Sequence, residues 1–410
     1  MPQRIETVIV GGGQAALALS YHLRALGREH VILERARMAE RWRSERWDSL
    51  VFQFPRSSMT LPGFGPPAGD PHGFAPREDV VRFLEDYRAR IAAPLREGVT
   101  VRAVTATAGP GRYHVDTDAG AYAADHVVAA TGPYHTPATS PAAAGLPAGV
   151  AQVHASRYRN PAGLPPGGVL VVGSGASGCQ IVEDLLDAGR TVHLSVGHHR
   201  RFPRRYRGRD VWWWIEQVGV LDQTIEERPD GPPAPNPLVT GARGGHDIDL
   251  RDYAAAGVTL LGHLEGVQEG RCYFAADAVE EIARGDQGLV SFAKVAEAWA
   301  ERAGLGRPAE HERVDRPLPV PRVAPAGALD LHVAGITAVV WATGYRPDFG
   351  WVRLPVLDAS GDAVHRRGLS ACPGFYFIGL PWLSKLKSSV LCGVGEDAER
   401  IAAAIDAGRR

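Results

Sequence analysis

The pattern of apolar and polar positions divides the N-terminal region into a strand, a helix and a second strand. Thr7–Val10 is rich in β-branched residues and predicts a buried strand. Apolar side chains then recur at helical spacing over Ala15–Leu26, and Gly27 suits the left-handed conformation in which helices commonly end. Val31–Leu33 predicts the second strand, and Glu34 follows it directly. The order is that of a βαβ unit.

A glycine-rich segment, Gly11–Ala16, joins the first strand to the helix and matches the pattern G-x-G-x-x-G/A. Gly11 permits a tight turn, Gly13 lets the backbone approach a pyrophosphate, and Ala16 lets the helix pack closely on the strand. Glu34 can accept hydrogen bonds from ribose hydroxyls, and its charge would repel a 2′-phosphate. A glycine-rich turn of an unrelated α/β protein is the alternative, but the complete order favours a site for FAD or NAD.

The same order returns near the middle of the chain. Val169–Val172 predicts a strand, Gly173–Gly178 is a second glycine-rich segment, and Cys179–Ala188 predicts a helix before a further strand at Thr191–Leu194. Two such units in one chain predict two dinucleotides, and the usual pair is FAD with a nicotinamide.

The second unit lacks the acid of the first. Ser195 holds the position that Glu34 holds in the first unit, and Arg200 and Arg201 follow. A hydroxyl with nearby guanidinium groups suits a 2′-phosphate, so we expect this unit to bind NADPH. Solvated surface positions are the alternative for both arginines.

Two apolar runs end in Ala-Thr-Gly, one on each side of the second glycine-rich segment. These runs, His126–Gly132 and Ala338–Tyr345, each predict a strand that ends against a cofactor, although either alone also fits an ordinary strand-to-turn junction. As a pair they mark where the chain crosses between domains. Farther on, Phe375–Gly379 predicts a buried strand and Val394–Ala407 a helix whose first turn holds Glu396. A helix N-terminus that faces a flavin would stabilise the charge of the reduced ring, and plain capping of a surface helix is the alternative.

Aromatic residues cluster in two places. Trp42, Phe52 and Phe54 follow the first unit, in an apolar stretch expected to lie over the flavin. Trp212–Trp214 stands on a predicted helix over Asp210–Val218, where three adjacent side chains cannot share one face. We therefore expect at least one of the three in the core, with the wall of a substrate pocket as the alternative place for another.

The composition narrows the function. Hydrophobic residues make up 45% of the chain and charged residues 22%, the net charge is −1 and the pI is about 7.0, so nothing indicates a nucleic-acid or membrane partner. No secretory signal or membrane-spanning run is visible, so a cytoplasmic protein is expected. The four cysteines form no C-x-x-C pair, which argues against a disulfide framework, against a zinc site and against the thiol pair of flavoprotein disulfide reductases. No metal is expected.

With these motifs in place, the sequence resembles the class B flavin-containing monooxygenase family, in its bacterial branch. The resemblance rests on Gly11–Ala16, Leu146–Tyr158, Gly173–Gly178 and Ala342–Tyr345. The family's segment F-x-G-x-x-x-H-x-x-x-F/Y corresponds to Leu146–Tyr158, in which the Phe is absent and the Gly-to-His spacing is one residue longer.

The resemblance implies an activity. NADPH reduces FAD, the reduced flavin forms a C4a-(hydro)peroxide with O2, and a small organic substrate is oxygenated. Tyr158 stands where Baeyer–Villiger members usually carry Trp, which favours oxygenation at N or S. Many relatives place an Asn beside the flavin where this chain has Ser57 and Ser58, so either serine takes that role or the enzyme releases peroxide. An NADPH oxidase, an NADPH:acceptor reductase and a flavoprotein without turnover are the alternatives.

The resemblance also implies an α/β fold with two Rossmann-type dinucleotide-binding domains and, as is common for such enzymes, a homodimer. The FAD domain would be discontinuous, formed by residues 1–160 and 330–410, with an NADPH domain of residues 161–329 inserted. The residues assigned to FAD are Gly11, Gly13, Gln14, Ala16, Glu34, Arg35, Trp42, Val104, Ala130, Thr131, Gly132 and Glu396. Those assigned to NADPH are Gly173, Ser174, Gly175, Ser177, Gly178, Gln180, Ser195, Arg200, Arg201, Thr343 and Gly344. The candidates beside the reacting groups are Ser57, Ser58 and His154, the last with a linker role implied by the family.

Overall fold

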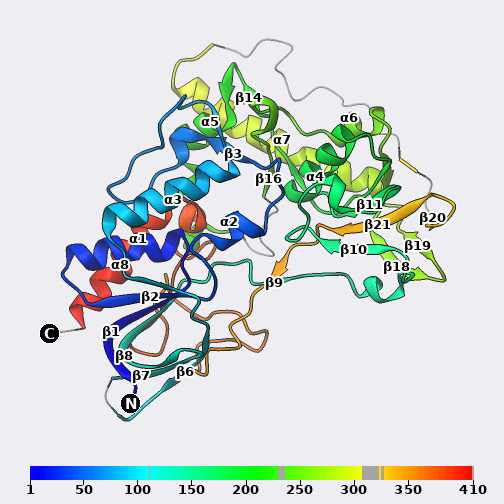
Figure 1. The fold of residues 1–410 in the computed structure, drawn as a ribbon. Helices are drawn as coiled ribbons and strands as arrows, with labels where there is room; N and C mark the ends of the chain where they lie inside the picture. The colour runs from blue at the N-terminus through cyan, green and yellow to red at the C-terminus, as the bar shows by residue number, and fades with distance from the viewer. Residues whose placement is uncertain (110, 230–235, 307–322, 325–326, 409–410) are drawn as a thin grey trace.

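Two sheets with parallel central strands form the framework of the computed structural model, which describes residues 1–109, 111–229, 236–306, 323–324 and 327–408 (Figure 1). The first sheet has the strand order β5-β2-β1-β8-β7-β6, with β23 beside β8. Its strands are β1 Gln3–Val10, β2 His30–Glu34, β5 Leu95–Glu97, β6 Val101–Ala106, β7 Tyr113–Thr117, β8 Gly120–Ala129 and β23 Phe375–Phe377. Strands β5, β2, β1 and β8 are parallel to one another. Strand β7 pairs antiparallel with β8, and β6 pairs antiparallel with β7.

The second sheet has five parallel strands in the order β10-β21-β11-β12-β17. They are β10 Ala151–His154, β11 Gly168–Val172, β12 Val192–Ser195, β17 Thr259–Leu261 and β21 Ile336–Trp341. The expected limits of 161 and 329 do not enclose this sheet, because β10 precedes them and β21 follows them. Parallel partners are joined by long crossovers, so strand neighbours far apart in the chain leave no local sequence signal.

Helices cover these sheets, as Figure 1 shows for α1, α3 and α8 beside the first sheet and α4 beside the second. Their bounds are α1 Gln14–Ala25, α2 Glu40–Ser44, α3 Arg77–Ile91, α4 Ala176–Asp187, α5 Val211–Gln217, α6 Leu250–Ala255, α7 Ala278–Arg302 and α8 Val394–Ala407. Helix α1 contacts both α3 and α8, and α4 contacts β11 and β12. Among the described residues, no helix is both long enough and apolar enough to cross a membrane.

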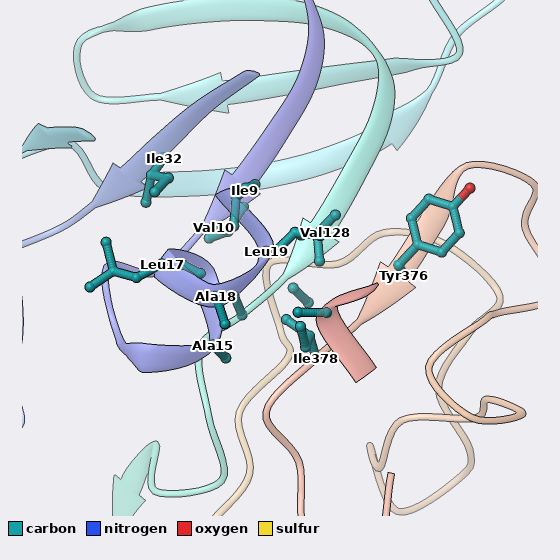
Figure 2. Close-up of a cluster of buried hydrophobic side chains, with 14 of the residues drawn as sticks. Ile9, Val10, Ala15, Leu17, Ala18, Leu19, Ile32, Val128, Tyr376 and Ile378 are labelled. Carbon is teal, nitrogen blue, oxygen red and sulfur yellow. The ribbon is translucent and has the colours of Figure 1, made fainter. Parts of the chain in front are cut away.

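The core of the first unit lies between the parallel strands and the helices. Ile9, Leu17 and Val128 are fully buried there, and Figure 2 shows them beside Ile378 from the C-terminal segment. Full burial of such a side chain stabilises the fold by about 1.5–3 kcal/mol. The C-terminal segment therefore completes the core of the first unit.

One short strand pair lies between the segments that follow the two sheets. Strand β9 (Thr136–Pro137) pairs antiparallel with β22 (Tyr345–Arg346), so the chain segments after the two Ala-Thr-Gly sequences run side by side (Figure 1). The remaining strands are β3 Val51–Pro55, β4 Phe74–Pro76, β13 Arg200–Arg201, β14 Arg205–Tyr206, β15 Arg209–Asp210, β16 Pro237–Leu238, β18 Leu264–Gln268, β19 Arg271–Phe274 and β20 Gly327–Asp330. The pairing of β9 with β22 brings the carboxyl ends of β8 and β21 to the same region.

Candidate active-site cleft

A cleft of about 820 Å³ lies where both glycine-rich loops meet. Gly11–Gly13 line it from the first unit and Gly175–Ser177 from the second. Both loops follow the carboxyl end of a parallel strand, which is where ligands of open α/β sheets bind. The cleft therefore joins two cradles of the same design.

In the first loop the backbone requires a glycine at position 11, and Gly13 borders open space. Gly11 has φ +108°, and a Cβ on it would lie 2.7 Å from the carbonyl oxygen of Ala130. A Cβ on Gly13 would meet no atom within 4 Å. Gly13 is also the N-cap of α1 without a side-chain cap, so backbone N–H groups at this helix end remain available to an anion.

The second loop repeats this geometry. Gly173 has φ +107°, and a Cβ on it would lie 2.7 Å from the carbonyl oxygen of Ala342, while one on Gly175 would meet no atom within 4 Å. A Cβ on Gly178 would lie 1.9 Å from the carbonyl oxygen of Gly173, so glycine is required for α4 to pack here. The Ala-Thr-Gly segments are thus the close neighbours of the first glycine of each loop.

These observations fit two dinucleotides. The space beside Gly13 and Gly175 is the room that a pyrophosphate needs, at the positive end of a helix in each case. The hydroxyl of Thr131, in the first Ala-Thr-Gly segment, is buried at the cleft with no hydrogen-bond partner in the described part of the chain. A bound polar ligand would satisfy it.

The two βαβ units differ in the residue that ends their second strand, which is Glu34 in β2 and Ser195 in β12. Glu34 lines the cleft, its Oε2 accepting from the N–H of Gly12 at 2.7 Å and its Oε1 from that of Ala36 at 2.9 Å. Ser195 is buried, and its hydroxyl donates to the carbonyl oxygen of Gly262 at 2.8 Å. The hydroxyl assigned to a 2′-phosphate is therefore engaged by the backbone.

The two arginines after β12 have different surroundings. Arg201 pairs with Asp249 at 2.9 Å and with Asp286 at 3.2 Å. Arg200 lies over the ring of Phe202 at 4.8 Å, burial lowers its pKa, and its buried Nε has no hydrogen-bond partner among the described residues. Neither arginine lines the cleft. Arg201 directs its guanidinium to two carboxylates, whereas the Nε of Arg200 is available for a further hydrogen bond.

The remaining assignments divide by whether they border the cleft. Those that line it, besides the residues already placed, are Gln14, Arg35, Trp42, Ala130, Gly132, Ser177, Gln180 and Gly344. Those that do not are Ala16, Ser57, Val104, Ser174, Thr343 and Glu396. Val104 is fully buried in β6, and Val99–Val101 line the cleft in its place.

Glu396 lies in the first turn of α8 and does not line the cleft. Its carboxylate pairs with Lys385 at 2.7 Å and with Lys387, and Lys387 also pairs with Asp222 at 2.7 Å. This cluster joins the C-terminal segment to the region after α5. The residues of the C-terminal segment that line the cleft include Ser389–Cys392.

Two candidates beside the reacting groups border the cleft with their polar atoms already engaged. The hydroxyl of Ser58 donates to the carbonyl oxygen of Pro55 at 2.7 Å. His154 Nε2 donates to the carbonyl oxygen of Gly344 at 3.0 Å, and its Nδ1 accepts from the N–H of Ser156 at 3.1 Å. Burial lowers the pKa of His154, so the ring is neutral near pH 7 and ties β10 to the second Ala-Thr-Gly segment.

Aromatic side chains form one wall. Trp42, Phe52, Phe54 and Trp212 line the cleft, and the rings of Phe54 and Trp212 lie 4.7 Å apart. Trp214 is fully buried in the core. The Trp212–Trp214 run is therefore divided between core and cleft, as three adjacent positions on a helix require.

Sequence reasoning missed several lining residues. They are Arg41, Arg46, Gln53, Trp351 and the segment Ser389–Cys392. Burial lowers the pKa of Arg41. Its place among other arginines before the aromatic stretch was the only local signal, and no pattern marks residues 389–392.

A cleft shared by two Rossmann-type glycine loops defines the class of oxidoreductases that hold two dinucleotides. Residues 8–217 match the model of the family described as pyridine nucleotide-disulphide oxidoreductase, and the chain belongs to this family. It is 32% identical over 402 residues to the CzcO-like oxidoreductase of Geobacillus kaustophilus, with 97% of each chain covered. It is 33% identical over 193 residues to the indole-3-pyruvate monooxygenase YUCCA1 of Oryza sativa subsp. japonica, which covers 46% of this chain and 47% of that relative.

A flavin-containing monooxygenase from Stenotrophomonas maltophilia has the same fold, with a TM-score of 0.67, 21% identity and 100% of both chains covered. The expected resemblance to flavin-containing monooxygenases is confirmed, and so are the α/β fold with two dinucleotide-binding domains and the expectation of a flavoprotein oxidoreductase.

Proposed function

We propose that this chain binds FAD at the first glycine loop and NADPH at the second, and uses O2 to oxygenate a small organic substrate. The observation that carries the proposal is that both loops line one cleft. FAD, when bound, supplies the group that accepts hydride and reacts with O2. Glu34 at the first loop suits a ribose without a 2′-phosphate, and the absence of an acid at position 195 suits NADPH at the second.

The chain's own residues position ligands and exclude water. The N-termini of α1 and α4 supply N–H groups to the two pyrophosphates, and Gly13 and Gly175 leave room for them. His154 holds the second Ala-Thr-Gly segment against β10. The Trp42, Phe52, Phe54 and Trp212 wall keeps the space between the cradles apolar.

The same wall supports a substrate class. Trp212 and Phe54 present aromatic faces, and Gln53 between Phe52 and Phe54 is the polar neighbour. Such a wall suits an apolar or aromatic molecule with an amine or thioether group, since soft N or S atoms attack an electrophilic oxygen.

A second function, NADPH oxidation with release of peroxide or reduction of another acceptor, is favoured by one observation. Ser58 directs its hydroxyl to Pro55, and Ser57 does not line the cleft, so neither offers the side-chain donor that the missing Asn would give. No comparable observation favours reduction of a disulfide by a thiol pair. All four cysteines are free thiols, and of these four only Cys392 lines the cleft.

The experiment is to follow NADPH consumption by the purified protein in air, with a panel of amines and thioethers. Oxygenated product formed in step with NADPH, at a rate raised by substrate, is the expected result. NADPH consumption matched wholly by H2O2 across the panel would assign the oxidase function. Reduction of an added electron acceptor in place of O2 would assign the reductase function.

A further inference from the structure

Two histidines and a glutamate from three separate elements converge outside the cleft. His198 follows β12, His263 lies between β17 and β18, and Glu281 is in the first turn of α7. Their candidate ligand atoms all lie within 4.8 Å of one another. None of the three lines the cleft, and the function proposed above does not use them.

The ring of His263 is oriented as a metal ligand would be. Its Nδ1 is 2.6 Å from the carboxylate of Asp277, whose other oxygen accepts from the backbone N–H of His263 at 2.9 Å. A carboxylate bonded to Nδ1 fixes the proton there and leaves Nε2 with its lone pair exposed. A Cβ on Gly262 would lie 2.5 Å from this Asp277 carboxylate, so the close approach depends on glycine.

Glu281 is a buried carboxylate that faces this histidine pair. Its side chain is 4% exposed, Oε2 lies 2.7 Å from Nδ1 of His198, and Oε1 pairs with Arg284. Burying a carboxylate is costly unless a cation neutralises it. Arg284 supplies that charge, and because its side chain is 59% exposed it can turn outward when an ion takes over.

We propose that His198, His263 and Glu281 bind one divalent ion of the zinc type. Two imidazoles and a carboxylate are the ligands of three-residue zinc sites, in which water occupies the fourth position. His198 is 64% exposed and His263 41% exposed, so the fourth position faces solvent. The nitrogen ligands disfavour Mg²⁺ and Ca²⁺, which take oxygen ligands.

The site also connects to the second glycine loop. Gly197, beside His198, donates its N–H to the hydroxyl of Ser174 at 3.0 Å, and that hydroxyl donates to the carbonyl oxygen of Gly197 at 2.9 Å. An ion held by His198 and Glu281 links this segment to α7. Because the ion binds only the folded arrangement, its binding raises the melting temperature.

The experiment titrates the full-length protein, first stripped with EDTA, with Zn²⁺ against a chelating dye, and with Co²⁺ to observe the visible bands of a four-coordinate ion. One ion per chain is expected, with a higher melting temperature and no effect of Mg²⁺. His198→Ala and Glu281→Gln should weaken Zn²⁺ binding by a hundredfold or more, and Asp277→Asn by about tenfold or more. Glu280→Gln, an exposed carboxylate on the same turn, is the matched control and should leave binding unchanged.

The proposal is overturned if wild type takes up no Zn²⁺, or if His198→Ala and Glu281→Gln bind Zn²⁺ as wild type does. His198→Ala changes an exposed side chain, so it reports on the site even if Glu281→Gln fails to fold. Loss of NADP⁺ affinity in His198→Ala without any Zn²⁺ uptake would identify an anion-binding cluster instead. The site and the proposed function fail separately, because Zn²⁺ uptake requires neither FAD nor turnover.

Discussion

Glu34 Oε2 accepts a hydrogen bond from the backbone N–H of Gly12 at 2.7 Å, which ties the end of β2 to the first glycine loop. The same carboxylate accepts from the N–H of Ala36 at 2.9 Å. Glu34 therefore shapes the loop in addition to lining the cleft.

Glu34→Gln should weaken FAD binding by about tenfold or more, because an amide cannot accept from both N–H groups and a lost charge-assisted bond costs about 1–3 kcal/mol. The measurement is the dissociation constant of FAD from the apoprotein. Glu97→Gln is the control, since Glu97 also accepts from a backbone N–H, that of Met38 at 2.8 Å, but does not line the cleft. Equal FAD affinities in wild type and Glu34→Gln would contradict the assigned role.

Arg200 and Arg201 should respond differently to the same change. Arg200→Met should raise KM for NADPH by about tenfold and leave that for NADH unchanged, because it removes one charged donor for a phosphate. Arg201→Met should instead destabilise the fold by about 1–2 kcal/mol, since Asp249 and Asp286 would each lose one of two arginine partners. Arg251 still pairs with both carboxylates in this variant. Anaerobic reduction kinetics and urea unfolding measure the two effects. If Arg200→Met leaves the NADPH-to-NADH preference intact, another group contacts the 2′-phosphate.

Trp212→Ala should uncouple NADPH consumption from product formation. It opens the aromatic wall to water beside Phe54, and loss of a buried Trp also costs about 3–5 kcal/mol of stability. The ratio of H2O2 to oxygenated product is the measurement. Trp213→Ala is the matched control, because Trp213 packs on Trp214 and Trp299 and does not line the cleft. Equal peroxide ratios in the two variants would exclude the wall from substrate binding.

Buried histidines should make the fold sensitive to acid. Burial lowers the pKa of His193, and that of His30 and His126 as well. The unfolded chain, with histidine pKa near 6.5, then binds protons that the folded chain does not. Stability is therefore complete above about pH 6.5 and decreases as the pH falls toward the lower folded values.

Urea unfolding at about pH 7.5 and about pH 5.5 measures this loss. His193→Leu removes one titrating group and should reduce the difference between the two pH values. The contribution of His246 to the pH dependence has the opposite sign, because its hydrogen bond to Glu183 raises its pKa. His246→Gln should therefore enlarge the difference in stability between the two pH values. A fold that is equally stable at both pH values would show that the buried rings do not control its acid response.

The sequence predicts the parts of the site that are local. Each glycine loop with its strand and helix is specified by contiguous residues, and the observed helix Val394–Ala407 has the predicted bounds. The surroundings of Ser195 and Arg201 could not be predicted in this way. The groups that engage them, Gly262 for the serine and Asp249 and Asp286 for the arginine, lie far along the chain.

The extent of the second sheet was not predictable for the same reason. Strand β21 inserts between β10 and β11, and the backbone bonds that place it connect residues far apart in sequence. The Trp212–Trp214 run shows an intermediate case. Helical periodicity predicts that its members diverge, but only the fold decides that Trp214 enters the core and Trp212 the cleft.

The most direct test is to mix the flavin-loaded protein with NADPH in the absence of air and follow the visible absorbance of the flavin. Gly13 and Gly175 both have negative φ and border open space, so Gly13→Asp and Gly175→Asp should fold normally and place a repelling charge in one cradle each. Wild type should be yellow and bleached by NADPH, Gly13→Asp colourless, and Gly175→Asp yellow but not bleached. A wild-type protein that binds no flavin, or that stays yellow with excess NADPH, would contradict the central claim that one cleft holds both dinucleotides.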